Sequence, residues 1–463
     1  MSAPSISETE GRSPLGGQNL AHNYTQSSPS HGYDYEWNAQ GRETVIQPPM
    51  SPPARFRGPI SMAIPMAIIP AVLIAFSLGV AGQAADLSFA TPDGLFRLEP
   101  ESSDRTDLLP GGDRSYDNLA WSADGQRLAV VQNYGDVYRV DPGAAAPERL
   151  FSSTCQRPPA IDLAWQTDGD TLVISERCPA PIAGAVGQQA LWLSSGPGEL
   201  ARVDLLPEAQ EAVISLAPDG SRMAYVANQH IFVVDLEGGR PRRLTQTPGI
   251  YGAAGSPLAW SPDGTRLAFY EGSYPFQRLN VVAADGSDRR VLTPAADFQI
   301  YRSRLLWSPD GRYIAFYRPH NPPFSNQEVI ALVNVNTGET QDLTRPGFYD
   351  ALSWAPNSRQ LVMAVGAQSG RQALFRLDLV DQEFTALTTQ PLQNLLHSQW
   401  APDADWIAFT ATPPGATSDT QVLHRVRPDG TQLTPLTSSD EYVYPFVWIP
   451  APLDTGAQGL SGP

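Results

Sequence analysis

The segment LAWSPDGTRLAFY, which runs from Leu258 to Tyr270, contains the pattern on which the architecture rests. It predicts a strand, a tight turn and a second strand. Asp263 and Gly264 supply the side-chain cap and the positive φ that such a turn needs. The second strand, Arg266–Tyr270, is apolar, which is typical of a strand buried between neighbouring sheets.

This pattern recurs along the chain at a nearly constant spacing. Seven of the ten tryptophans fall on one register, Leu216 fills the single gap, and successive register positions are 44 to 51 residues apart. Self-similarity at such a period indicates a repeat architecture rather than several unrelated domains. The register tryptophans are Trp121, Trp165, Trp260, Trp307, Trp354, Trp400 and Trp448.

Each repeat has room for two more strands after the first pair. A third strand follows a loop of variable length, as in Ile231–Asp235, and a fourth ends in a Leu-Thr pair, as in Leu244-Thr245. Four short antiparallel strands in roughly 46 residues form the blade of a β-propeller. The sequence therefore predicts an all-β fold, with a single β-propeller of four-stranded blades.

The two ends of the repeat region indicate how the ring closes. Residues Leu87–Gly111 resemble a blade without its first strand, and Trp448 opens a repeat that contains only a first strand. We expect Tyr444–Ile449 to complete the N-terminal blade, because closure removes exposed sheet edges. The count is then eight blades, with seven as the alternative if one weak repeat is not a blade.

The repeat W-S-P-D-G-x-x-[IL]-[AV]-[FY] resembles the TolB-type, WD-repeat-like propellers. This family includes TolB and the propeller domains of prolyl and dipeptidyl peptidases, and the resemblance covers residues 86–452. It implies a propeller with an interaction role. Peptidase chemistry is not implied, because the G-x-S-x-G motif of the hydrolase domain is missing from the sequence.

Composition excludes several classes of function. The chain has 463 residues and a formal charge of −17, and all of its 31 basic residues are arginines. Mechanisms that use a lysine, such as Schiff-base formation, are excluded. The acidic balance argues against a nucleic-acid partner, which needs a basic surface. Two cysteines are too few for a disulfide-dense small fold.

The N-terminal region predicts a membrane location. Residues 1–58 have a disordered composition, and Ile60–Val80 is an uncharged span of 21 residues within a predicted transmembrane helix, 59–82. Arginines just before the span place the N-terminus in the cytoplasm and the propeller, 86–452, outside it (periplasmic or at the cell surface). A cleaved signal peptide is the alternative. Residues 453–463 are expected to form a disordered tail.

The two cysteines are expected to pair. Cys155 precedes the strand that leads to Trp165, and Cys178 follows the next strand. A hairpin brings these two points to the same end of a blade, so a disulfide between them is geometrically plausible. Two independent buried thiols are the alternative.

Candidate ligand-binding residues lie in the loops that join blades and that follow second strands, because binding residues concentrate on loops over a rigid scaffold. Aromatic or histidine side chains precede several first strands, and arginines nearby suit a carboxylate. Packing against the next blade is the alternative for the aromatic residues. The candidates are Tyr116, Tyr251, Tyr301, Arg302, Arg304, Arg318, His320, Tyr349, His397, Tyr442 and Tyr444.

No catalytic set, metal site or cofactor is predicted. The periodic aspartates, such as Asp263, lie one to a turn without the D-x-D-x-D-G spacing of a calcium loop, so turn capping is the favoured role. His320 and His397 are the histidines weighed, and set aside, for a metal near the channel of the propeller.

Three functions remain open. The leading prediction is a membrane-anchored, extracytoplasmic interaction scaffold that binds a protein, a peptide or a glycan. The first alternative is a propeller hydrolase or lyase with its site at the channel mouth. The second is a sensor that couples an outside ligand to the cytoplasmic tail.

Overall fold

The computed structural model describes residues 86–450, apart from 100–103, 113, 145, 180–187, 204, 206–213, 247–257, 273–276, 294–304, 321–326, 367–370, 414, 417–419 and 440. The chain divides into two units, Met1–Leu73 and Ile74–Pro463, and every described residue belongs to the second. All regular elements among the described residues are β-strands. This confirms the all-β class.

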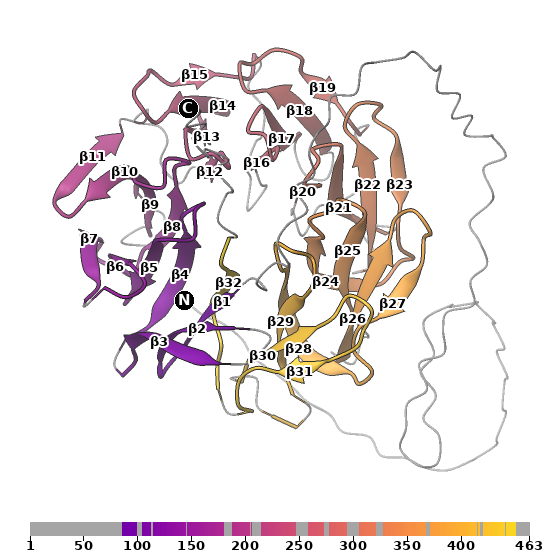
Figure 1. The fold of residues 1–463 in the computed structure, drawn as a ribbon. Helices are drawn as coiled ribbons and strands as arrows, with labels where there is room; N and C mark the ends of the chain where they lie inside the picture. Colours follow the sequence, from indigo (N-terminus) through magenta and orange to yellow (C-terminus); the bar gives the residue numbers. More distant parts are fainter. Residues whose placement is uncertain are drawn as a thin grey trace, which may run out of the picture. The chain divides into compact units, whose positions relative to one another are not determined.

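The strands form six four-stranded antiparallel sheets and one sheet of eight strands, which consists of two blades, so the ring has eight four-stranded blades (Figure 1). Seven blades use strands that are consecutive in the chain. Blades seven and eight also meet where β26 pairs with β28, through Arg371 and Gln393. From blade two to blade eight the strands are β4 (Tyr116–Trp121), β5 (Leu128–Gln132), β6 (Asp136–Val140), β7 (Glu148–Ser152); β8 (Ala160–Trp165), β9 (Leu172–Cys178), β10 (Gln188–Gly196), β11 (Glu199–Val203); β12 (Ile214–Leu216), β13 (Arg222–Ala227), β14 (His230–Asp235), β15 (Arg242–Arg243); β16 (Leu258–Trp260), β17 (Arg266–Glu271), β18 (Arg278–Ala283), β19 (Arg290–Val291); β20 (Leu305–Trp307), β21 (Tyr313–Pro319), β22 (Glu328–Asn334), β23 (Thr340–Asp342); β24 (Phe348–Trp354), β25 (Gln360–Gly366), β26 (Arg371–Asp378), β27 (Phe384–Ala386); and β28 (Leu392–Trp400), β29 (Ile407–Thr412), β30 (Val422–Val426), β31 (Thr434–Pro435).

Blade one is built from both ends of the repeat region. It contains β32 (Phe446–Trp448), β1 (Leu87–Thr91), β2 (Gly94–Leu98) and β3 (Arg105–Pro110). β32 pairs with β1 in an antiparallel register that sets Leu87 opposite Trp448, and the two strands lie together in Figure 1. The predicted closure and the count of eight blades are confirmed for the described residues.

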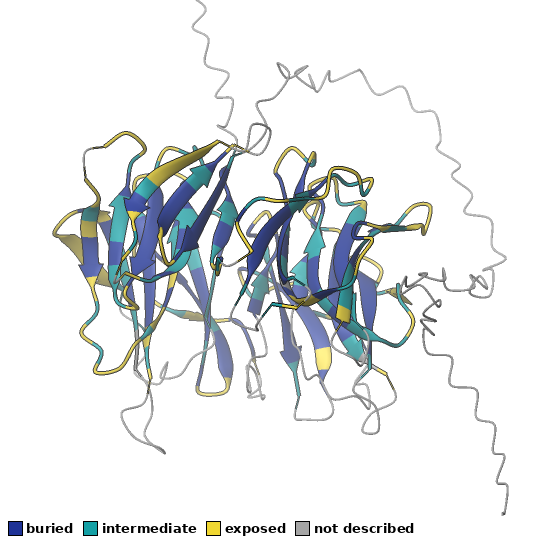
Figure 2. Ribbon diagram, turned by 90° about the horizontal axis from the view of Figure 1, so that it is seen from below, coloured by how far each residue is buried: buried dark blue, intermediate teal, exposed yellow. Residues whose placement is uncertain are grey.

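The hydrophobic core is divided among the blade interfaces rather than collected in one centre. Eight clusters of buried side chains occur in the described residues, and each joins two neighbouring blades. One cluster sets Trp406 of blade eight against Phe89 and Phe96 of blade one, which seals the ring. Figure 2 shows the result, with buried residues along the strands and exposed residues at the turns.

The register tryptophans connect each blade to the one before it. Six of the seven donate the indole N–H to the preceding blade, and in five of these the acceptor is the backbone carbonyl just before the preceding register position. Trp307, for example, donates to the Ala259 carbonyl at 3.0 Å. Each of these six tryptophans therefore combines apolar burial with a directional bond between innermost strands.

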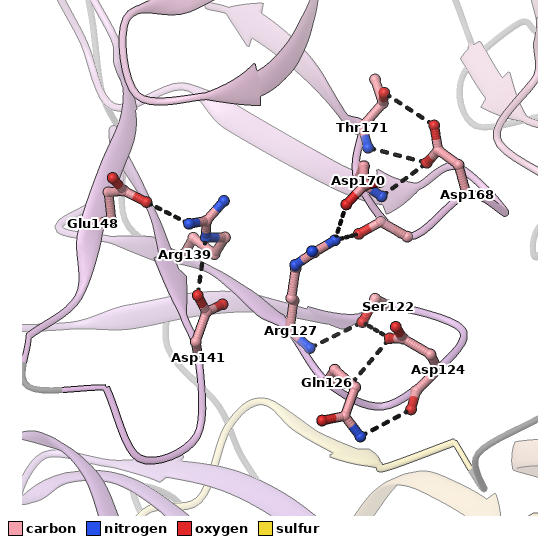
Figure 3. A network of polar contacts seen from close by, with 11 residues as sticks. Ser122, Asp124, Gln126, Arg127, Arg139, Asp141, Glu148, Asp168, Asp170 and Thr171 are labelled. Atoms are coloured by element: carbon pink, nitrogen blue, oxygen red, sulfur yellow. Dashed lines mark hydrogen bonds and ion pairs between the residues drawn. The ribbon is translucent and has the colours of Figure 1, made fainter.

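The serine and aspartate of the repeat hold its first turn. Ser261 donates its hydroxyl to the Asp263 carboxylate at 2.5 Å and accepts the backbone N–H of Arg266 at 2.9 Å. Burial by itself raises the pKa of Asp263, but hydrogen bonds from Ser261 and Thr265 outweigh it, so the pKa lies below its ordinary value. Figure 3 shows the equivalent contacts of Asp124 with Ser122 and Gln126, and the backbone N–H groups of Asp170 and Thr171 that donate to Asp168. The aspartates are turn caps, as predicted.

The Leu-Thr pair that follows the fourth strand in five of the blades has a specific role. The threonine hydroxyl accepts a backbone N–H near the start of the third strand, 14 residues earlier, and so ties the outer edge of the blade to its interior. Thr293, for example, accepts the N–H of Leu279 at 2.9 Å. The same contact occurs at Thr245, Thr344, Thr388 and Thr437.

The predicted localisation needs correction. The described part of the chain contains no helix that is long and apolar enough to span a bilayer. Strands form all of its regular structure, and the segment 59–82 lies outside the described residues. The prediction of a single-pass membrane protein with a cytoplasmic N-terminus and an extracytoplasmic propeller is therefore withdrawn. The boundaries 1–58, 86–452 and 453–463 stay predictions.

Closure of the ring can be tested by truncation. Removing all residues after Glu441 deletes the buried side chains of Phe446 and Trp448 and exposes the edge of β1. Large buried aromatic side chains each contribute about 3–5 kcal/mol, so this truncated chain should aggregate or lose its cooperative thermal transition. A control truncated after Pro452 keeps β32 and should unfold like the full chain. Equal melting of the two truncated chains would mean that the ends do not close the ring.

Candidate functional site

The propeller has two faces with different connections. Because strands alternate in direction, the W-S-P-D-G turns lie on one face, and the connections that join blades lie on the other. We call the second face the loop face and define it by the connections after β3, β7, β23, β27 and β31. The connections 206–213, 247–257 and 294–304, which also join blades, lie outside the described residues.

Two of the predicted aromatic residues are buried between blades. Tyr116 is 5% exposed and donates its hydroxyl to the Pro110 carbonyl at 2.7 Å. Tyr349 is 3% exposed and donates to the Arg345 carbonyl at 2.6 Å. In both, the ring packs in an interface cluster and the hydroxyl binds the chain a few residues upstream. Tyr116 and Tyr349 therefore follow the alternative prediction, in which the aromatic side chain packs between blades instead of contacting a ligand.

Two other predicted residues, Arg318 and His320, form contacts within the protein. Arg318 forms an ion pair with Asp342, which reduces its availability to an anionic ligand. His320 is exposed, and its backbone N–H donates to the Gln327 carbonyl at 2.8 Å. The remaining predictions fall outside the described residues and stay predictions: Tyr251, Tyr301, Arg302 and Arg304.

Three predicted residues lie where the ring closes. Tyr442 and Tyr444 are 43% and 48% exposed, and the ring of Tyr444 lies 5.5 Å from that of His397, between centroids. The backbone holds this segment firmly: Val443 donates to the Gln421 carbonyl at 2.8 Å, and Tyr444 donates to Ala90 at 3.2 Å. Exposed aromatic side chains on a fixed backbone are suited to contact a ligand.

Two carboxyl groups that the sequence analysis did not select lie near the starts of innermost strands. Burial raises the pKa of Asp117 above its ordinary value, and bonds from Tyr134 and Ser115 offset this only in part. Asp162 is exposed to solvent. Desolvation by the protein around it nevertheless raises its pKa, and this effect is larger than the lowering caused by the positive charge of Arg177. Their places, four and three residues before a register tryptophan, are the sequence signal that could have identified them.

Cys155 and Cys178 form a disulfide on the loop face of blade three, with Cα atoms 5.5 Å apart. The buried side chain of Glu176 lies beside it. Ser153 orients this carboxylate, because its hydroxyl donates to Glu176 Oε1 and accepts the backbone N–H of Cys155. The predicted pairing is present in the structure.

Several solved structures are similar to this chain at low sequence identity. A eukaryotic initiation factor matches 80% of this chain and 100% of its own at 14% identity, with a TM-score of 0.53. An oligogalacturonate lyase from Vibrio parahaemolyticus matches over 72% of this chain and 83% of its own at 15% identity (TM-score 0.46). TolB from Acinetobacter baumannii matches over 64% and 77% at 18% identity (TM-score 0.35).

No protein-family profile and no curated protein sequence matches the chain. At the identities above, the likeness to solved structures concerns the fold alone. It agrees with the β-propeller that the sheets of this chain form.

The disulfide predicts a thiol count. Denatured but unreduced protein should show no free thiol, because Cys155 and Cys178 are the two cysteines of the chain. Reduction should add about two mass units, and two thiols should then react with a thiol reagent. Two reactive thiols before reduction would contradict the disulfide.

Proposed function

We propose that this protein is a binding scaffold that holds a protein, peptide or glycan ligand on its loop face. The observation that carries the proposal is the group formed by Tyr442, Tyr444 and His397 at the closure of the ring. Both tyrosines are more than 40% exposed although each is set in a rigid backbone. Large exposed aromatic side chains held in place give much contact area at a low cost in conformational entropy.

The charge of the chain narrows the class of ligand. The formal charge is −17, and Asp117 and Asp162 lie near the starts of innermost strands, next to the loop face. Arg318, a candidate anion contact, is paired with Asp342. These charges favour a neutral or cationic ligand over a polyanion, and they argue against nucleic acid.

An enzyme is the second candidate, because two carboxyl groups have the raised pKa values that acid–base chemistry uses. Desolvation by the surrounding protein is the main cause for both Asp117, which is half-buried, and Asp162, which is exposed. Perturbed carboxyls near one face of a propeller would suit a hydrolase or lyase. Binding is preferred, because the aromatic group is exposed and already positioned, whereas Asp117 accepts a hydrogen bond from the Tyr134 backbone at 3.0 Å.

The proposal is tested by screening immobilised peptides and glycans with the purified full chain. For every ligand retained, the double variant Tyr442→Ala/Tyr444→Ala should weaken binding at least tenfold, because truncating central aromatic contacts costs about 2 kcal/mol or more. The matched control is Phe384→Ala, an exposed aromatic residue at the start of β27, away from the loop face.

Three results would decide between the candidates. Loss of binding in the tyrosine variant with normal binding by Phe384→Ala supports the scaffold. Equal binding by all three proteins would overturn the proposed surface. Cleavage of a retained ligand that disappears in Asp117→Asn or Asp162→Asn would replace the scaffold with the enzyme.

A further inference from the structure

We propose that reduction of the Cys155–Cys178 disulfide converts this part of blade three into a binding site for a thiophilic divalent cation such as Zn²⁺. The ligands would be the two thiolates and the carboxylate of Glu176. This inference does not depend on the proposed binding function.

The ligand atoms are already grouped. One atom each from Cys155, Glu176 and Cys178 lies within 4.8 Å of the other two, and no other group of three or more such side chains was found among the described residues. Two sulfur ligands of one zinc ion lie about 2.3 Å from it, and so at most about 4.6 Å apart. Opening the disulfide and small shifts would therefore bring the three atoms into coordination.

The backbone explains this arrangement. Glu176 and Cys178 are two residues apart on β9, so their side chains project from the same face of the strand. Cys155 comes from the connection between β7 and β8, and its backbone N–H donates to Ser153 Oγ at 3.1 Å. The connection from blade two to blade three and the second strand of blade three thus supply the ligands.

The burial of the Glu176 carboxylate also favours a bound cation. Glu176 is only 5% exposed, and within the described part of the chain no arginine or histidine forms an ion pair with it. Its contacts there are the Ser153 hydroxyl and the Cys155 sulfur, 3.3 Å away. A disulfide sulfur has no hydrogen to donate. Buried carboxylates normally have a cationic partner or bind a metal ion, and this one faces the sulfur pair.

The chemistry balances with an external thiol reductant. Two electrons and two protons cleave the S–S bond and leave two thiols, while two reductant thiols are oxidised to a disulfide. The cation then displaces the two thiol protons. Three protein ligands leave one position of a tetrahedral ion for water. Two thiolates select a thiophilic ion over Mg²⁺ or Ca²⁺.

The test uses Co²⁺ as a spectroscopic probe and Zn²⁺ as its competitor, on the full chain without a purification tag. A phosphine reductant opens the disulfide, takes oxygen from water to become the phosphine oxide, and is then removed under nitrogen. The reduced protein should bind one Co²⁺ with sulfur-to-cobalt charge-transfer absorption, and Zn²⁺ should abolish the band. The oxidised protein should show no such band.

Variants identify the ligands. Glu176→Gln should weaken Co²⁺ binding at least tenfold, since loss of groups that merely orient ligands already costs about 10- to 100-fold. The control Glu199→Gln, an exposed residue of the same blade, should bind like the wild type. Cys155→Ser should remove most of the charge-transfer band. Circular dichroism on each sample checks that it is folded.

The reduced and oxidised wild-type chains give a decisive comparison without any variant. No charge-transfer band in the reduced, folded protein would overturn the proposal, and so would equal bands in both redox states. Equal affinity of Glu176→Gln and Glu199→Gln would remove the carboxylate from the site and overturn the three-ligand assignment.

Discussion

The hydrogen bond from an indole N–H to the innermost strand of the preceding blade is the contact on which this propeller depends. A propeller has no single core, so each blade must pack against its neighbour at the correct height and angle. Apolar packing alone is non-directional. The bond from Trp354 to the Leu306 carbonyl, at 3.0 Å, adds that direction, and equivalent bonds repeat around much of the ring.

The one interface whose register position lacks tryptophan shows what replaces this bond. Blade four carries Leu216, and here Gln166 of blade three donates its side-chain amide to the Gly220 carbonyl at 3.1 Å. The approach is close: a Cβ on Gly220, where φ is +64°, would lie 2.7 Å from the Cα of Gln166. Glycine is required there by both its backbone conformation and the lack of space.

Sequence patterns predicted the fold well, because the information about it is local and repeated. The turn residues, the alternating burial and the incomplete repeats at Leu87 and Trp448 all lie within short windows, and the ring closes as they indicate. The cysteine pair followed from hairpin geometry. By contrast, the acceptor of the Trp165 indole lies 45 residues away, so no local pattern could reveal it.

The candidate site was harder to predict, for physical reasons. A tyrosine before a first strand can point into the next interface, as Tyr116 does, or out to solvent, as Tyr444 does. The residue type alone does not determine in which direction the tyrosine side chain points. Glu176 was missed because a single acidic residue in an apolar strand has no pattern, and its relation to the disulfide appears only when two segments meet.

The most direct test of the central contact compares two register tryptophans, one that makes this bond and one that does not. Trp307 donates to Ala259, whereas the buried indole nitrogen of Trp400 has no hydrogen-bond partner in the described part of the chain. Both lie in interface clusters and are less than 10% exposed, so Trp→Phe removes similar apolar area from each. Urea unfolding should show that Trp307→Phe loses about 1–2 kcal/mol more stability than Trp400→Phe, at an unchanged m-value. Equal losses would contradict the account, because the packing of the rings would then be sufficient to order the blades.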